Sequence, residues 1–253
     1  MLKVLGLLLV AAGLSPAATI IFTTPTGATS GGNAVSAEAD FVFSAGQVVI
    51  TLKNLQSGMV TIGQVLSDLD FVLSNGGTKL VLDATTTMSA SAPLGTTTCT
   101  SSGCVVDSTV ITDLGWGFGT LNGGNTICDV CGTGAVLSIN TGASVPPEKT
   151  IIGPNPTTQD GLVNAQHQPF INQQAVFTLK NSAILSSTTV TSATFSFNTS
   201  PDITVDGCSS TNPNCGTTTQ STPEPVGTFL MGSGLLALAF MGRFGSKLRR
   251  SSK

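Results

Sequence analysis

The sequence predicts an all-β protein: an antiparallel, jelly-roll-like β-sandwich with an N-terminal signal peptide before it and a C-terminal transmembrane helix after it. Three observations lead to this prediction. Apolar and polar residues alternate in several short runs; Gly, Thr, Ser and Val are abundant; and long helix-forming stretches occur only at the two ends. About 200 residues separate those ends, enough to bury a sizeable core.

The first residues have the layout of a secretory signal peptide. Residues 1–3 form a short basic start, residues 4–14 are apolar, and residues 15–18 are small or proline. We predict a signal peptide over residues 1–17, which signal peptidase would remove after Ala17. The chain is therefore expected to be exported.

Two hairpins are predicted in the β-sandwich domain, which is expected over residues 18–207. Residues 37–43 are apolar at every second position with two acids between, and residues 48–53 follow after a glycine turn, so the two runs should pair antiparallel. Residues 71–73 and 79–82 flank an Asn-Gly-Gly turn whose glycines tolerate positive φ, which predicts a second hairpin.

Further elements are expected along the same domain. The segment 62–69 has apolar residues at helical spacing, and we predict a short helix that caps one end of the sandwich. In the last expected strand, one face should point inward from Ala193 onward. Further strands are predicted over residues 105–111, 134–139, 175–180 and 190–198.

The charge of the exported part excludes some function classes. Between residues 18 and 225, four lysines stand against thirteen acidic residues, a net charge of −9. Proteins that bind nucleic acid or anionic membranes need clustered Lys and Arg, and this region has no such cluster. We therefore expect no nucleic-acid partner.

Six cysteines form three close pairs, and an even number in an exported chain favours disulfides. Local pairing is the simplest arrangement, although six cysteines allow 15 connectivities. Zinc bound by the first two pairs and redox chemistry at the second pair are the alternatives. We predict neither a metal nor a cofactor. The disulfide candidates are Cys99 with Cys104, Cys128 with Cys131, and Cys208 with Cys215.

Catalytic residues are few, so we expect that the protein is not an enzyme. His167 is the only histidine, and no nucleophile motif occurs. Trp116 would serve as a sugar platform or, as we expect, pack in the core. Two carboxylate pairs would suit a glycosidase or a Ca²⁺ site, but we expect them to be solvated loop acids. These pairs are Asp68 with Asp70 and Asp202 with Asp206.

The C-terminal region has three parts after a Ser/Thr-rich segment over 208–222, which we expect to be a flexible stalk. A Pro-Glu-Pro sequence precedes an apolar run over 226–241 of roughly 16 residues, barely long enough to span a bilayer. Basic residues follow and should stay in the cytoplasm. An ordinary, unprocessed anchor is the alternative. The residues of this signal, expected over 223–253, are Pro223, Glu224, Pro225, Arg243, Arg249 and Arg250.

This tail resembles the PEP-CTERM sorting signal of bacterial surface proteins. The resemblance implies recognition by an exosortase near Pro223-Glu224-Pro225 and a transient anchor in the inner membrane. Within the domain, residues 22–27, 62–73, 167–170 and 175–179 are similar to a group of exosortase-dependent surface proteins of soil bacteria, which implies no known activity.

We therefore expect an exported protein of the cell surface or extracellular matrix of a Gram-negative-type bacterium, with a structural or adhesive role and extracellular polysaccharide as a candidate partner. The alternative is a secreted carbohydrate-binding or glycoside-hydrolysing module that uses the same sorting tail. An exposed Trp116 or a cleft with two facing carboxylates would favour that alternative.

Overall fold

The computed structural model describes residues 19–112, 114–121, 123–128, 149–158, 161–198 and 203–210. These residues all belong to one compact unit, Met1–Gly216. The predicted signal peptide over 1–17, the strand expected over 134–139 and the sorting signal over 223–253 lie outside them. No helix in the described part of the chain is long and apolar enough to cross a bilayer.

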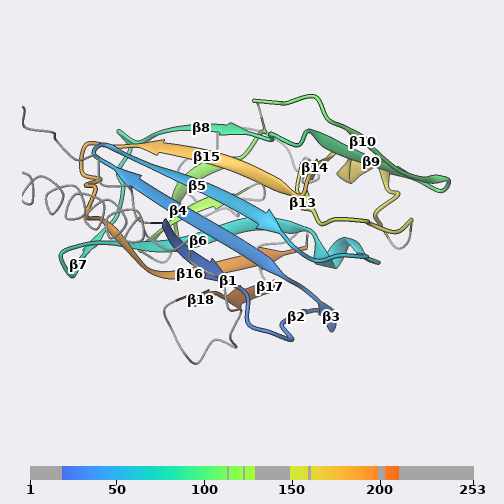
Figure 1. Cartoon of the computed structure of the whole chain (residues 1–253), viewed down its shortest axis with the longest axis horizontal. Coiled ribbons are helices and arrows are strands. Elements are labelled where there is room, and N and C mark those ends of the chain that lie inside the picture. Colours follow the sequence, from blue (N-terminus) through green and yellow to red (C-terminus); the bar gives the residue numbers. More distant parts are fainter. Residues whose placement is uncertain are drawn as a thin grey trace, which may run out of the picture. The chain divides into compact units, whose positions relative to one another are not determined.

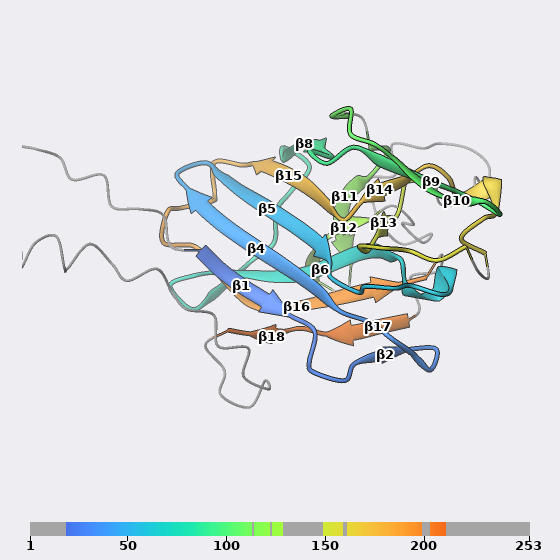
Figure 2. The same cartoon turned by 45° about the vertical axis from the view of Figure 1, so that its right-hand side comes forward.

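The fold is all-β and sandwich-like, as predicted, with two large sheets among the described residues (Figures 1 and 2). The first sheet has the order β18(Cys208–Ser209), β1(Thr19–Thr23), β4(Ala37–Ser44), β5(Gln47–Asn54), β15(Gln174–Lys180), β8(Thr87–Ser91). The second has the order β10(Gly103–Asp107), β9(Thr96–Thr100), β14(Phe170–Asn172), β13(Ile151–Ile152), β6(Leu66–Asn75), β12(Gly124–Cys128), β11(Gly117–Leu121).

Three more strands attach to the second sheet, and one small ribbon stands apart. β16(Thr189–Phe197) pairs with β6 and with β17(Ile203–Asp206), while β7(Thr78–Leu80) pairs with β6. The ribbon joins β2(Thr29–Ser30) to β3(Asn33–Ala34). β6 therefore runs through the middle of the second sheet.

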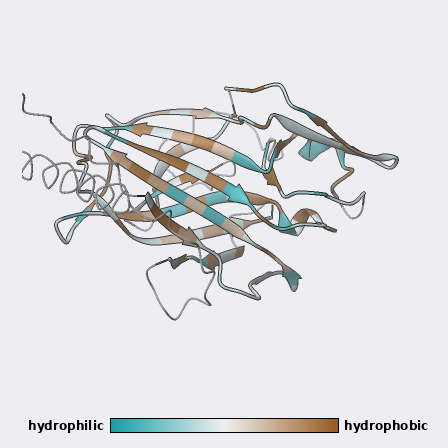
Figure 3. Cartoon of the chain, viewed as in Figure 1, coloured by the Kyte–Doolittle hydropathy of each residue, from teal (hydrophilic) through white to brown (hydrophobic). Residues whose placement is uncertain are grey.

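The core lies between the two sheets. Phe41 on β4 packs against Phe71 on β6, with ring centroids 5.5 Å apart. Along β5 every second residue is buried, and the hydropathy alternates visibly along β4 and β5 (Figure 3). This is the alternation expected of strands that bury one face.

Both predicted hairpins are confirmed. β4 and β5 pair antiparallel, with Phe41 opposite Ile50, and β6 pairs antiparallel with β7. Gly46 in the first turn has φ +81° and Gly76 in the second has φ +58°, a region that favours glycine.

Two other predicted strands are confirmed with small shifts. The strand expected over 175–180 is β15, and the strand expected over 190–198 is β16, in which Ala193, Phe195 and Phe197 are buried as predicted.

The helix predicted over 62–69 is wrong. Only a single 3₁₀ turn, η1(Ile62–Gln64), forms, and the chain then enters β6. Leu66 and Leu69 have helical spacing, but they lie on a strand whose first residues are buried on both faces. A strand covered on both sides loses its alternation, so its apolar residues can mimic a helical stripe.

Two further boundaries and one strand direction differ from the prediction. The strand expected over 105–111 ends at Asp107, although Ile111 forms an isolated bridge with Ala92. The second sheet is mixed, because β13 and β14 pair in parallel. Cys208 and Ser209, the first residues of the expected stalk, form β18 and pair with β1.

Candidate functional site

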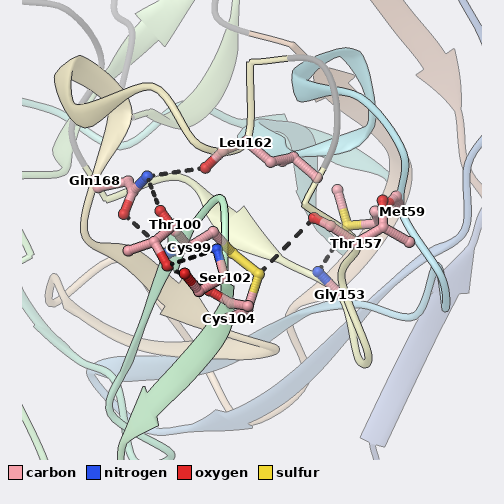
Figure 4. The surroundings of a disulfide bond; sticks show 10 residues. Met59, Cys99, Thr100, Ser102, Cys104, Gly153, Thr157, Leu162 and Gln168 are labelled. Atoms are coloured by element: carbon pink, nitrogen blue, oxygen red, sulfur yellow. Dashed lines mark hydrogen bonds between the residues drawn. A yellow bond between two sulfur atoms is a disulfide. The ribbon is translucent and has the colours of Figure 1, made fainter.

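The most distinctive local structure is the hairpin of β9 and β10 at one end of the second sheet. Two residues, Ser101 and Ser102, connect the strands, and Cys99 lies directly opposite Cys104. The two cysteines form a disulfide with Cα atoms 3.9 Å apart (Figure 4). This local pairing is the one expected from the sequence, and it locks the hairpin across its two strands.

The remaining cysteines bear on the alternatives. Cys128 and Cys208 are disulfide-bonded as well. Cys131 and Cys215 lie outside the described residues, so the local pairing of these four cysteines stays a prediction. Because the sulfur atoms of Cys99 and Cys104 are bonded to each other, they are not the thiolates that the zinc alternative requires.

The disulfide packs into a small second core, separate from the core between the sheets. Its members come from loops as well as strands, and Figure 4 shows several of them around the two sulfur atoms. Because the disulfide is part of this core, the core holds the strands β9 and β10 in place. The buried members are Met59, Val65, Cys99, Ile152, Leu162 and Phe170, with Ile62 and Cys104 packed against them.

Gln168 ties the hairpin to the loop that precedes β14. Its side-chain Nε2 donates to the carbonyls of Cys99 (2.7 Å) and Leu162 (2.9 Å), and its Oε1 accepts from the backbone N–H of Cys99 (2.9 Å) (Figure 4). The amide thus makes the two bonds that a neighbouring strand would make. Nothing in the sequence distinguishes this glutamine from a surface residue.

Two buried amides hold the rest of this end together. Asn54 Nδ2 donates to the carbonyls of Gln64 and Ile151, both at 2.9 Å, and so joins β5, η1 and β13. Gln64 Oε1 in turn accepts from the backbone N–H of Val60 at 2.8 Å, and its Nε2 donates to the carbonyl of Ala34 at 2.7 Å. Sequence analysis missed both residues. Thr61, three residues before Gln64, is the one available signal, because a Thr-x-x-Gln spacing matches a capping box.

Exposed valines lie on both faces of β10, because successive residues of a strand point to opposite faces. Val105 is 71% exposed, Val106 is 51% exposed, and Val110 just beyond β10 is exposed as well. We call these three valines the edge patch. Between residues 94 and 111 the only charged side chain is Asp107. This hairpin therefore carries little charge in a domain whose body is acidic.

The carboxylates predicted as loop acids are not part of the hairpin. The prediction of solvated loop acids is wrong for Asp68 and Asp70. Both lie on β6, and Asp68 is only 3% exposed. Burial raises the pKa of Asp70 above its ordinary value, although a hydrogen bond with Thr126 works against this. The signal that could have found them is the apolar residues that flank the pair, Val65-Leu66 before it and Phe71-Val72-Leu73 after it.

The second predicted acid pair is described only in part. Asp206 on β17 accepts a hydrogen bond from Thr194 Oγ1 at 2.9 Å, and Asp202 lies outside the described residues. Thr194 stands between Asp70 and Asp206 in the strand register, so these two carboxylates share one sheet face with a strand between them. That arrangement is not a cleft with facing acids.

Trp116 packs in the core, as predicted. It is only 4% exposed, its ring lies 5.1 Å from the ring of Phe177, and its Nε1 donates to the carbonyl of Lys149 at 3.0 Å. A cavity of about 410 Å³ lies beside it, lined mainly by Thr86, Met88, Leu114, Trp116 and Phe118. A ring this deeply buried does not offer its face to a sugar.

His167 ends a short 3₁₀ turn, η2(Ala165–His167), beside Gln168. Its Nδ1 is buried and makes no hydrogen bond. No Ser, Thr or Cys lies within five residues of it in the sequence. Across the described part of the chain, His, Cys, Asp and Glu do not gather into a group of three that would hold a metal ion.

Comparison with protein-family models, with curated proteins and with solved structures finds no significant match to this chain. The candidate site is therefore defined by geometry alone: a disulfide-locked edge hairpin with exposed valines on both faces. The described residues of this hairpin and its supports offer a surface for contact.

Proposed function

We propose that this chain is an exported surface or extracellular-matrix protein with a structural or adhesive role, delivered by exosortase sorting. In this proposal a jelly-roll-like sandwich follows a signal peptide and precedes a sorting signal with a transmembrane helix. The observation that carries the proposal is the order of the tail: Pro223-Glu224-Pro225, then the apolar run over 226–241, then Arg243, Arg249 and Arg250.

The disulfide supports export. Disulfides form and persist in oxidising compartments and are rare in the bacterial cytosol. The Cys99–Cys104 bond clips a surface hairpin, which is the use expected in a secreted domain. The net charge of −9 between residues 18 and 225 also suits a protein that stays soluble and avoids nucleic acid.

Delivery would proceed in three steps. Signal peptidase removes residues 1–17, the apolar run over 226–241 arrests in the inner membrane, and the basic end keeps its side in the cytoplasm. The exosortase then recognises the segment around Glu224 and removes or exchanges the tail. The chain is the substrate of this enzyme and contributes no catalytic residue.

The alternative of a carbohydrate-binding or glycoside-hydrolysing module has less support. It needs an exposed Trp116 or two carboxylates facing each other across a cleft. Trp116 is buried, and Asp70 and Asp206 lie on one sheet face with Thr194 between them. Extracellular polysaccharide remains in the proposal only as a contact partner of the surface.

The test replaces Glu224 by glutamine in a host that has an exosortase. Glu224→Gln removes the charge and keeps the size, and we expect the variant to be exported but to stay unprocessed in the inner membrane. Gln220→Ala, four residues earlier, is the matched control and should mature normally. Mass spectrometry of the C-terminus measures the outcome, and normal maturation of Glu224→Gln would refute the sorting proposal.

A further inference from the structure

In the described part of the chain, no strand pairs with the outer edge of β10. β10 lies at the end of the second sheet, and within the described residues β9 is the only strand that pairs with it. An edge strand presents a row of unpaired N–H and C=O groups, which can pair with another strand. Natural edges are often protected by lysine, proline or a bulge. β10 has the sequence Gly-Cys-Val-Val-Asp and contains neither lysine nor proline.

The register shows which backbone groups face outward. In an antiparallel pair, residues opposite each other alternate between bonded pairs and closer, non-bonded pairs. Thr100 and Gly103 close the two-residue turn as a bonded pair, so Cys104 and Cys99 form a non-bonded pair. Their Cα separation of 3.9 Å agrees with this. Cys104 and Val106 therefore direct their N–H and C=O groups away from β9.

We propose that β10 is a docking edge for a second copy of this chain, with β10 pairing antiparallel against β10 of the other copy. A two-fold axis at Val105 puts Val105 opposite Val105 of the copy. Val106 then faces Cys104, Asp107 faces Gly103, and the outward groups of Cys104 and Val106 bond to each other across the axis.

A second copy fits this edge because the strand is self-complementary. The two-fold register brings β-branched valines together at the closest, non-bonded position, and it sets no acid opposite another acid. Elsewhere the charge of −9 between residues 18 and 225 opposes contact between copies. At the edge patch that repulsion is reduced, because Asp107 is the only charge between residues 94 and 111.

The disulfide and the size of the strand set the strength of the contact. The Cys99–Cys104 bond and the second core hold the hairpin in its bonding conformation, so little ordering is needed on association. Five residues a side make about four backbone hydrogen bonds and bury far less than the ~1,000 Å² typical of a stable interface. The affinity of one copy for another is therefore low. Many copies held on one surface would bind with a higher overall avidity.

The first experiment uses photo-cross-linking of the full chain in a mild non-ionic detergent. Benzoylphenylalanine replaces Val105 in one protein and Leu185 in the control, because Leu185 is also exposed, at 47%, but lies outside the hairpin. We expect a cross-linked dimer from position 105 and none from position 185. Equal yields at both positions, or cross-links from position 105 only to the same chain, would overturn the proposal.

The second experiment removes a single outward N–H group. Val106→Pro deletes a donor that β9 does not use, so the hairpin should persist while pairing between copies falls by on the order of tenfold. Val106→Thr keeps the N–H and the branched shape, and it should pair like the unchanged protein. An unchanged urea-unfolding midpoint of the oxidised protein confirms that the proline variant retains its fold. Undiminished dimer in that variant would contradict the proposal.

A third measurement does not depend on proline. Val105→Lys and Val105→Glu each place like charges at the two-fold axis, so neither variant should pair with itself. A mixture of the two, carrying different tags, should pair again, because lysine then faces glutamate. Failure of the mixture to co-purify would exclude this register. These outcomes are independent of exosortase processing, so they separate this proposal from the proposed function.

Discussion

Gly95 offers the sharpest test of how the hairpin is mounted. It lies just before β9 with φ +73°, and its carbonyl accepts from the N–H of Asn172 at 2.9 Å. A Cβ atom added to Gly95 would lie 1.9 Å from the carbonyl oxygen of Asp107, so the base of the hairpin would have to move. Gly46 is the matched control, because it has φ +81° and nothing within 4 Å of the same atom.

The two glycines separate backbone strain from collision. Alanine in the left-handed region costs about 1–2 kcal/mol, and both variants lose this amount. Gly95→Ala also crowds a packed backbone, which typically costs about 1–3 kcal/mol more. We therefore expect Gly46→Ala to lose about 1 kcal/mol of unfolding free energy and Gly95→Ala about 3 kcal/mol.

Equilibrium urea unfolding of the purified, oxidised protein measures both values. The slope of free energy against urea should stay unchanged, so the difference should show as a lower midpoint for Gly95→Ala. Equal losses in the two variants would refute the close approach of Gly95 to Asp107, and with it the rigid mounting of the hairpin on its base.

Three further predictions concern the domain. Burial raises the pKa of Asp70 in the folded state, so the stability of the fold should fall as the pH rises from the unfolded pKa through the raised folded pKa. Asp70→Asn should remove this fall. The variant should therefore have a higher melting temperature at about pH 7 but not at about pH 3. Replacing Cys99 and Cys104 together by serine opens a short loop and should lower the unfolding free energy by about 2 kcal/mol. No change in urea unfolding would show that this disulfide does not stabilise the domain. Asn54→Ala leaves two buried carbonyls without a hydrogen bond and should lower the unfolding free energy by about 2–4 kcal/mol. The control Asn164→Ala, at an exposed residue, should lower it by less than about 1 kcal/mol. Equal losses would contradict the role of Asn54.

The strands that bury one face could be predicted from the sequence. β5 and β15 bury every second residue, so the period of two is visible, and β4 keeps this alternation from Ala39 to Phe43. In β16 the buried residues Ala193, Phe195 and Phe197 keep the same spacing. β6 could not be predicted in full, because it is paired on both sides and covered on both faces near its start. Burial there depends on what packs from elsewhere in the chain, which local periodicity does not contain.

The candidate site was predictable only in its covalent part. The spacing of Cys99 and Cys104 indicated a clipped loop, and the structure has that bond. The amides that support it, Gln168 and Asn54, bond to backbone groups distant in the sequence, so no local pattern marks them. The edge patch was also missed, because Val105 and Val106 were expected to lie within a longer strand and not at an open edge.

The placement of the few charges gives a final reason to regard β10 as an edge that binds. On the outer face of the first sheet, Lys53 bonds Glu38 at 2.6 Å and Asp40 at 2.7 Å, so that face carries a charged cluster across β4 and β5. Burial alone would lower the pKa of Lys53, but these two acids raise it, and the lysine stays charged. The chain thus carries lysine on a sheet surface, and lysine is one of the residues that protect edge strands from pairing in other proteins. β10 carries none, and the disulfide holds that strand in a bonding conformation with Val105 and Val106 exposed, one on each face. The lysine that often protects an edge is thus absent where a disulfide makes pairing easiest, which is the pattern expected of an edge selected for contact between copies.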